Sequence, residues 1–211
     1  MKYFSLIIVF LIFSCGNKED ILLPKSNITI VKNIVDISPV YIFFRTKGKD
    51  TLAEVNKNTA ISTTNWAFNI DKRLPLRIVI PEIMKLQEKK RAGKANENKK
   101  PQNYYSYADS IGKNIAFLPF TDVYYKMEKP EINSFLIYFK KGNEMVLVNK
   151  KLIKKDEVLN YVFSLDFVIQ PKILLLFDKN MSFQEYIQNK ILIQNLESYN
   201  KNKEVPEEFV F

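Results

Sequence analysis

The residue types that most often carry out catalysis are scarce in this chain. Its 211 residues include no histidine and one cysteine, Cys15. Nucleophiles activated by histidine and metals bound by histidine therefore have no candidates. Chemistry would have to use carboxylates, lysine or tyrosine, and no two acidic residues stand at a spacing that identifies an acid and base couple. We therefore expect no metal, no cofactor and no enzymatic activity.

The single cysteine follows an apolar N-terminal segment. After Lys2, the run from Leu6 to Phe13 is too short to cross about 30 Å of hydrocarbon as a helix, which favours a secretory signal. The run leads into Ile12-Phe13-Ser14-Cys15, which resembles a bacterial lipobox, with a branched aliphatic residue three positions before the cysteine and a small residue directly before it. The alternatives are an uncleaved anchor, or an ordinary signal beside an unrelated cysteine.

The lipobox resemblance implies an address for the chain. Residues 1–14 would be a signal peptide, and Cys15 would carry several acyl chains, which anchor a protein stably to a membrane. We expect an exported protein anchored to the outer membrane, on its periplasmic face or at the cell surface. Residues 15–27 would form a tether, in which Lys18-Glu19-Asp20 resembles the export signal of some Bacteroidetes surface lipoproteins. An ordinary solvated tether explains the same three residues.

The chain has a net charge of +9, and some of its basic residues are clustered in one segment. Residues 88–110 contain six basic residues, namely Lys89, Lys90, Arg91, Lys94, Lys99 and Lys100. Such a run is typical of a solvated loop or of a contact with anionic lipid or wall polymer. We expect no nucleic-acid partner for an exported chain. Tyr104, Tyr105 and Tyr107 follow the run and could form a surface ligand patch, or could pack the loop onto the domain.

Two parts of the chain resemble each other. At one constant offset between residues 66–87 and 173–194, Asp71 aligns with Asp178 and Lys72 with Lys179. Upstream, at a smaller offset, the sequence matches are Tyr41–Phe44 with Leu136–Phe139, Gly48 with Gly142 and Val55–Lys57 with Val148–Lys150. Agreement at both ends of the unit predicts an internal duplication.

The repeated pattern predicts an α+β fold of two similar small sheet-plus-helix units. Each unit would contain a strand hairpin, a strand ending in Asp-Lys, a helix and a closing strand. We assign residues 28–130 to the first unit, with an exposed insert at 88–110, and residues 131–211 to the second. The first copy lacks one helix. Whether the units form separate domains or pair their sheets edge to edge stays open.

The second copy indicates its elements most clearly. Gly142 marks a hairpin turn, residues 155–167 suit a short amphipathic helix, and the apolar run 172–177 suits a strand buried on both faces. Ser182 is a candidate helix N-cap. In the first copy Pro81 should kink the helix or move its start to near Ile80. The expected closing strands are Ile115–Leu118 and Glu208–Phe211.

The layout of residues 135–211 resembles the periplasmic domain of ExbD and TolR proteins, with residues 40–125 as a degenerate copy. There too an apolar strand ends in an aspartate, before a helix that opens on a small residue or proline. The resemblance implies a module that contacts envelope proteins or peptidoglycan, with Asp71, Lys72, Asp178 and Lys179 as partner-binding positions. The two aspartates could instead cap helices. Proteins of that family keep a membrane helix with an acidic residue, which residues 1–14 lack, so no proton-conducting role carries over.

We therefore expect a membrane-anchored envelope lipoprotein that acts as a non-enzymatic binding module for an envelope protein or peptidoglycan. The alternative is a carboxylate-based hydrolase of envelope carbohydrate or lipid, which requires Asp71, Asp109, Asp122 and Asp178 to meet in one pocket. A third interpretation is a structural coat lipoprotein without a specific ligand. The sequence leaves the oligomeric state open.

Overall fold

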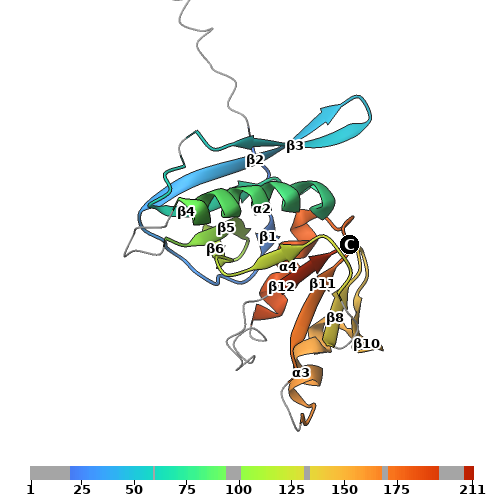
Figure 1. The fold of residues 1–211 in the computed structure, drawn as a ribbon. Helices are drawn as coiled ribbons and strands as arrows, with labels where there is room; N and C mark the ends of the chain where they lie inside the picture. The colour runs from blue at the N-terminus through green and yellow to red at the C-terminus, as the bar shows by residue number, and fades with distance from the viewer. Residues whose placement is uncertain (1–19, 59, 94–100, 131–133, 168–170, 195–206) are drawn as a thin grey trace, which may run out of the picture.

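The computed structural model describes residues 20–58, 60–93, 101–130, 134–167, 171–194 and 207–211. These residues form two six-stranded sheets and three α-helices (Figure 1), which confirms the predicted α+β fold. Residues 1–14 and the lipidation candidate Cys15 lie outside the described residues. None of the described helices combines the length and the apolar character needed to cross a membrane.

The first unit is built on a long hairpin. Strands β2 (Ile37–Lys47) and β3 (Asp50–Asn56) pair antiparallel, and β4 (Asn65–Ile70) lies parallel to β2. Helix α2 (Leu76–Ala92) then leads to β5 (Asn103–Asp109), which is parallel to β4. Two further strands pair with β5, namely β1 (Lys25–Ser26) in parallel and β6 (Asn114–Pro119) in antiparallel orientation.

The second unit repeats this order with an insertion. Strands β8 (Phe135–Phe139) and β9 (Met145–Val148) form the hairpin, β11 (Ile173–Phe177) lies parallel to β8, and α4 (Phe183–Leu192) leads to β12 (Glu207–Val210). Between β9 and β11 the chain adds β10 (Lys151–Lys154), the 3-10 turn η1 (Lys155–Glu157) and α3 (Val158–Phe163). The predicted extra helix of the second copy is confirmed.

The sheet orders show how closely the units correspond. The first sheet runs β3-β2-β4-β5-β1 and the second runs β9-β8-β11-β12-β7, where β7 (Tyr124–Lys126) pairs in parallel with β12. Strands β1 and β7 are therefore equivalent, and both were missed because two or three residues show no periodicity. The sheets divide between β6 and β7 rather than at residue 130, and β1 lies inside the predicted tether 15–27.

The predicted alignment of the hairpins was displaced by two residues. The backbone N–H of Asp71 donates to the Ile42 carbonyl at 3.0 Å, and that of Asp178 donates to the Phe139 carbonyl at 3.0 Å. Ile42 rather than Phe44 is thus the counterpart of Phe139. Strand β2 continues for five residues after Ile42, whereas β8 ends at Phe139. Aligning Gly48 with Gly142 at the two turns therefore displaced the strands. A displacement of two keeps each side chain on its predicted face.

In the residues that the structure describes, the basic and tyrosine-rich segment belongs largely to α2 and β5 rather than to an exposed insert. Helix α2 continues to Ala92 and therefore includes the first three basic residues of the run, whereas Lys94, Lys99 and Lys100 lie outside the described residues. Strand β5, and not Ile115–Leu118, is the equivalent of the closing strand β12. The tyrosines of β5 alternate between faces, which places Tyr105 and Tyr107 fully in the core. Helix α2 also begins at Leu76, before Pro81, so the predicted later start was wrong.

The two units share one hydrophobic core, to which both sheets and helices α2, α3 and α4 contribute. They meet where the two Asp-Lys loops run antiparallel, bridged at Pro75 and Ser182. Four backbone hydrogen bonds join the loops: Leu76 N–H to Met181 O at 2.9 Å, Phe183 N–H to Leu74 O at 2.8 Å, Arg77 N–H to Lys179 O at 2.8 Å and Gln184 N–H to Lys72 O at 3.0 Å.

This junction has a pseudo-two-fold axis, because exchanging the units exchanges the bonds in pairs. The donors are the first two N–H groups of α2 and of α4, which have no partner within their own helix. Each unit thus completes the helix start of the other. The sheets do not pair edge to edge in the described residues, so the junction settles the arrangement that the sequence left open.

Candidate functional site

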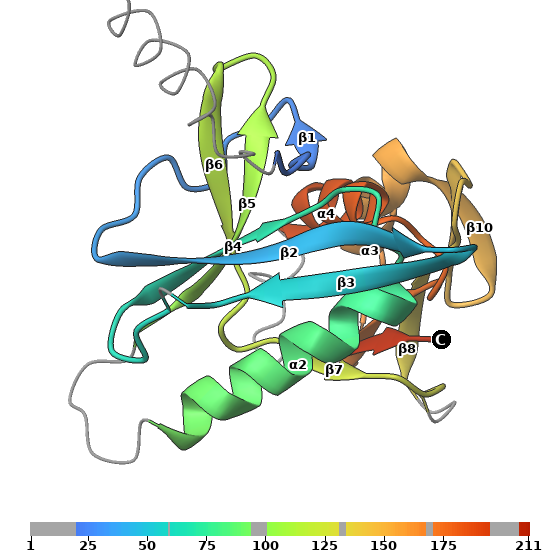
Figure 2. The ribbon, with the colours of Figure 1, turned by 90° about the horizontal axis from the view of Figure 1, so that it is seen from above.

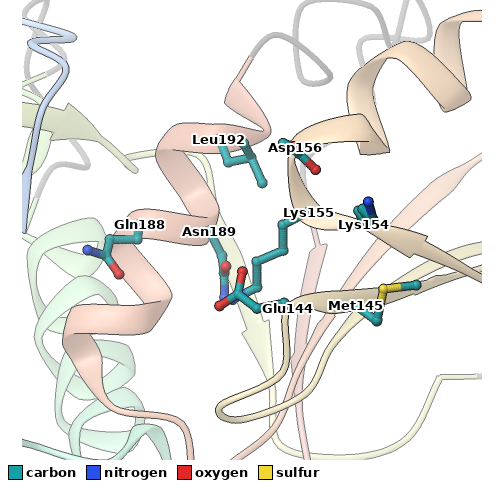
Figure 3. A pocket seen from close by; sticks show the side chains of 8 residues that line it. All are labelled: Glu144, Met145, Lys154, Lys155, Asp156, Gln188, Asn189 and Leu192. Carbon is teal, nitrogen blue, oxygen red and sulfur yellow. The ribbon is translucent and has the colours of Figure 1, made fainter.

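The second unit carries a pocket of about 600 Å³ between α4 and the segments that flank β9 and β10 (Figure 3). Eight residues line the pocket: Glu144, Met145, Lys154, Lys155, Asp156, Gln188, Asn189 and Leu192. All come from the second unit, and three belong to the inserted segment. The insertion therefore supplies one wall of the pocket and α4 supplies the other.

Backbone geometry fixes the inserted wall. Asn149 and Lys150 take positive φ angles of 43° and 75°, which form the tight turn that reverses the chain from β9 into β10. At the other end of this hairpin the Lys155 N–H donates to the Glu144 carbonyl at 2.9 Å. Glu144 and Lys155 are therefore neighbours at the pocket although they are distant in the chain.

The helical wall is anchored at its start. The Ser182 hydroxyl accepts from the Glu185 N–H and the Glu185 carboxylate accepts from the Ser182 N–H, a complete capping box that confirms the predicted N-cap. The Glu185 carboxylate also accepts from the Gly142 N–H at 2.8 Å, which ties α4 to the turn between β8 and β9. Burial alone would raise the pKa of Glu185, but the backbone donors of Gly142 and Ser182 and the charge of Lys155 lower it. Glu185 is therefore an anion at neutral pH.

The pocket combines both signs of charge with amide groups. In Figure 3 the side chains of Glu144, Lys155 and Asn189 converge, whereas Gln188 points away toward the first unit. Gln188 donates to the Lys25 carbonyl at 3.3 Å, consistent with that direction. Asn189 is buried, and Leu192 contributes apolar surface. Such a site can bind a small group that carries both an ammonium and a carboxylate.

A polar network lies deeper in the protein and crosses the two units. Tyr105 of β5 bonds to Tyr125 of β7, which bonds to Tyr186 of α4 with 3.1 Å between the hydroxyl oxygens. Tyr186 donates to the Glu208 carboxylate at 2.6 Å, and Glu208 pairs with Lys190 at 2.6 Å.

Burial raises the pKa of Tyr105 and of Tyr186 well above the ordinary value, and the charge of Glu208 adds to both shifts. Both hydroxyls therefore keep their protons at neutral pH. With every member almost fully buried, the network joins the two units and offers no surface to a ligand.

The predicted partner-binding residues lie at the junction of the units. The Lys72 and Lys179 carbonyls accept two of the four cross-unit hydrogen bonds, so the partner that these loops contact here is the other unit. Asp71 is buried and accepts from the Arg73 side chain at 2.9 and 2.7 Å. Burial alone would raise the pKa of Asp71, but Arg73 lowers it. A contact between these four residues and an external partner stays a prediction.

Neither aspartate caps a helix, which corrects the second interpretation of these positions. Asp71 accepts from the Arg73 N–H at 3.0 Å and Asp178 from the Asn180 N–H at 2.8 Å. Both carboxylates thus close a turn two residues further on, while the N-cap positions are Pro75 and Ser182. Aspartate favours such turns because its side chain reaches the backbone two residues ahead.

The four carboxylates named for the hydrolase alternative do not meet. Asp71 and Asp178 occupy the equivalent turns of the two units, Asp109 holds the turn after β5, and Asp122 is exposed. The pocket contains a different acidic pair, Glu144 and Asp156. Within the described part of the chain, no three acidic or cysteine side chains are placed to hold a metal ion.

Packing explains Lys90 of the basic run and the buried tyrosines. The Lys90 ammonium is buried, donates to the Gln102 carbonyl at 3.0 Å and to the Asn103 amide oxygen at 2.9 Å, and lies 4.7 Å from the Trp66 ring centre. The predicted ligand patch of Tyr104, Tyr105 and Tyr107 is therefore wrong for its two buried members, and Tyr104 is half-buried.

A second pocket of about 410 Å³ lies between α2 and β7, where the Arg91 guanidinium stands 4.0 Å from the Tyr124 ring centre.

Comparison with protein families, curated proteins and solved structures finds no match for this chain. The candidate site therefore rests on its own geometry. The sequence does not reveal the pocket, because the lining residues are scattered between positions 144 and 192 and none of them belongs to a motif. The one feature of the sequence that points to the pocket is the extra segment of the second copy, which supplies Lys154, Lys155 and Asp156.

Proposed function

We propose that this protein is a membrane-anchored envelope lipoprotein whose second unit binds peptidoglycan or an envelope protein without catalysing a reaction. The lipobox-like segment ending at Cys15 supports the anchor. The observation that carries the binding role is the mixed-charge pocket at Glu144, Lys155 and Asn189. The resemblance to ExbD and TolR periplasmic domains is part of this proposal.

The chemistry of the pocket favours peptidoglycan over a protein partner. Peptidoglycan stem peptides end in groups that carry both carboxylates and, where uncrosslinked, an ammonium. Lys155 can pair with the carboxylate and Glu144 or Asp156 with the ammonium. Charge-assisted hydrogen bonds of this kind are about twice as strong as neutral ones. A volume of about 600 Å³ is sufficient for a short peptide.

Binding to purified sacculi tests the proposal. We expect the mature chain to co-sediment with sacculi, and the double variant Glu144→Ala/Lys155→Ala to bind about tenfold more weakly, which corresponds to about 1.4 kcal/mol. The matched control is Lys47→Ala/Asp50→Ala, which removes an exposed lysine and an exposed aspartate that pair in register beside the hairpin turn of the first unit.

Three outcomes separate the alternatives. Equal loss in the control variant would mean that binding follows exposed charged side chains in general and would refute the pocket. The wild-type chain could instead fail to bind sacculi but cross-link to an envelope protein. If the double variant specifically lost that cross-link, the site would be assigned to that protein. If the protein released soluble fragments from sacculi and Glu144→Ala abolished that release, the hydrolase alternative would replace the binding role.

A further inference from the structure

The tip of the β5–β6 hairpin and the segment that follows β1 expose three aliphatic side chains. Ile28, Ile111 and Ile115 are 55%, 72% and 53% exposed. Ile28 follows β1, whereas Ile111 and Ile115 belong to the β5–β6 hairpin. Figure 2 shows this hairpin beside β1. Single exposed aliphatic residues are common on protein surfaces, but a group at one tip marks a contact surface.

Hydrogen bonds show that these residues share one rigid end of the molecule. The Ser110 N–H donates to the Ser26 carbonyl at 2.8 Å, which joins the hairpin tip to the end of β1. The Asp109 carboxylate accepts from the Ile111 and Gly112 N–H groups at 2.9 Å each, and from the Thr29 hydroxyl. The turn therefore holds Ile111 outward in a fixed position.

Lysines flank the aliphatic tip. In the sheet register Lys25 pairs with Ala108, which pairs with Ile115, so these three residues form a row on one face. Lys113 follows Ile111 in the turn, and both lysines are exposed. Aliphatic residues that project between exposed lysines fit the boundary of an anionic phospholipid layer, because lysines near the surface are attracted to the lipid phosphates.

We propose that this end of the first unit lies on the membrane, with Ile111 at the boundary of headgroups and acyl chains and with Lys25 and Lys113 at lipid phosphates. The inference rests on the anchor of the proposed function. Cys15 precedes Asp20 by five positions in the chain, and an extended chain spans at most about 3.5 Å per residue. The anchor thus holds the N-terminal end of the described chain within about 18 Å of the lipid.

Fluorescence quenching on tethered vesicles tests this orientation. The mature chain, residues 15–211, is coupled through the Cys15 thiol to a maleimide lipid in vesicles of phosphatidylglycerol and phosphatidylethanolamine that contain doxyl-labelled acyl chains. The test variant is Ile111→Trp. The control is Ile61→Trp, which alters an isoleucine 57% exposed before the start of β4, at the opposite end of the sheet. Trp66 is buried and adds the same background to both variants.

We expect at least twofold quenching of the indole introduced by Ile111→Trp and no quenching above background for Ile61→Trp. A companion variant, Ile111→Asn, should bind the same vesicles about tenfold more weakly when Cys15 is blocked by alkylation, whereas Ile61→Asn should not. Equal quenching at both positions, or none at either, would overturn the proposed face.

The coupling is chemical, so this test does not depend on acylation in the cell. Failure of the protein to incorporate labelled palmitate at Cys15 in growing cells would refute the anchor instead. The two failures are therefore distinguishable.

Discussion

The two units share a topology but differ in what fills the space between helix and hairpin. In the first unit the 17-residue α2 packs against the hairpin strand β3. In the second unit α4 has 10 residues, and the β10–η1–α3 insertion borders it across the pocket. The space between helix and hairpin is therefore closed by packing in the first unit and holds a pocket in the second.

The interiors of the units differ in a second respect. The equivalent turns and sheet registers show which residues of the two units correspond. Lys190 of the second unit corresponds to Ile83 of the first, Tyr186 to Val79, and Glu208 to Tyr105. The second unit therefore buries a charged pair where the first buries aliphatic side chains and a tyrosine. Burying a charged pair gives little net stability, but breaking one is costly.

The largest expected effect is the loss of one member of this pair. Glu208→Ala should lower the free energy of unfolding by about 3–5 kcal/mol, because it leaves the Lys190 ammonium buried without its counter-charge. Urea unfolding followed by Trp66 fluorescence measures the change in the free energy of unfolding. Trp66 lies in the first unit, but it reports on the second because one core joins both units.

Two further variants test the cause of that loss. Glu207→Ala removes a neighbouring carboxylate that pairs with Lys126 and Lys172 near the surface, and should cost about 1 kcal/mol or less. Lys190→Met/Glu208→Leu, which makes the second unit apolar like the first, should recover most of the stability lost in Glu208→Ala. If the double variant is as unstable as the single one, the network rather than the unpaired charge determines the loss.

The equivalent aspartates of the two turns give a smaller contrast. Asp71→Asn should cost about 1–2 kcal/mol at neutral pH, because it removes the charge paired with the partly exposed Arg73. Asp178→Asn should cost less than about 0.5 kcal/mol, because the amide oxygen can still accept from the Asn180 N–H. Chemical unfolding of the two variants under one condition measures the difference.

The pH dependence distinguishes charge from packing at Asp71. The pKa of Asp71 is lowered on folding, so its contribution is fully present above the unfolded value of about 4 and is lost as the pH falls through the lower folded value. The difference in stability between the wild type and Asp71→Asn should therefore shrink below about pH 4. A difference that stays constant down to pH 2.5 would assign the effect to packing.

Much of the fold was visible in the sequence because local patterns fix local structure. The Asp-Lys turns, the buried strand before Asp178 and the cap at Ser182 each depend on residues within a few positions. The tyrosine strand was misread because the basic run beside it suggested an exposed loop, whereas alternation places Tyr105 and Tyr107 in the core. The pocket could not be predicted, because Glu144, Lys155 and Asn189 meet only through the insertion and the packing of α4.

The last contrast concerns the two helix starts, which have nearly the same backbone angles but different residues. Pro75 has φ −74° and makes no side-chain cap, whereas Ser182 has φ −71° and caps α4. Ser182→Ala should cost about 1 kcal/mol, and Ser182→Asp only a few tenths, because an aspartate side chain can cap the same N–H. Thermal unfolding of the two variants measures both costs. A loss of only a few tenths of a kcal/mol in Ser182→Ala as well would mean that the cross-unit backbone bonds, which are common to both helices, already hold α4 and that the side-chain cap adds nothing.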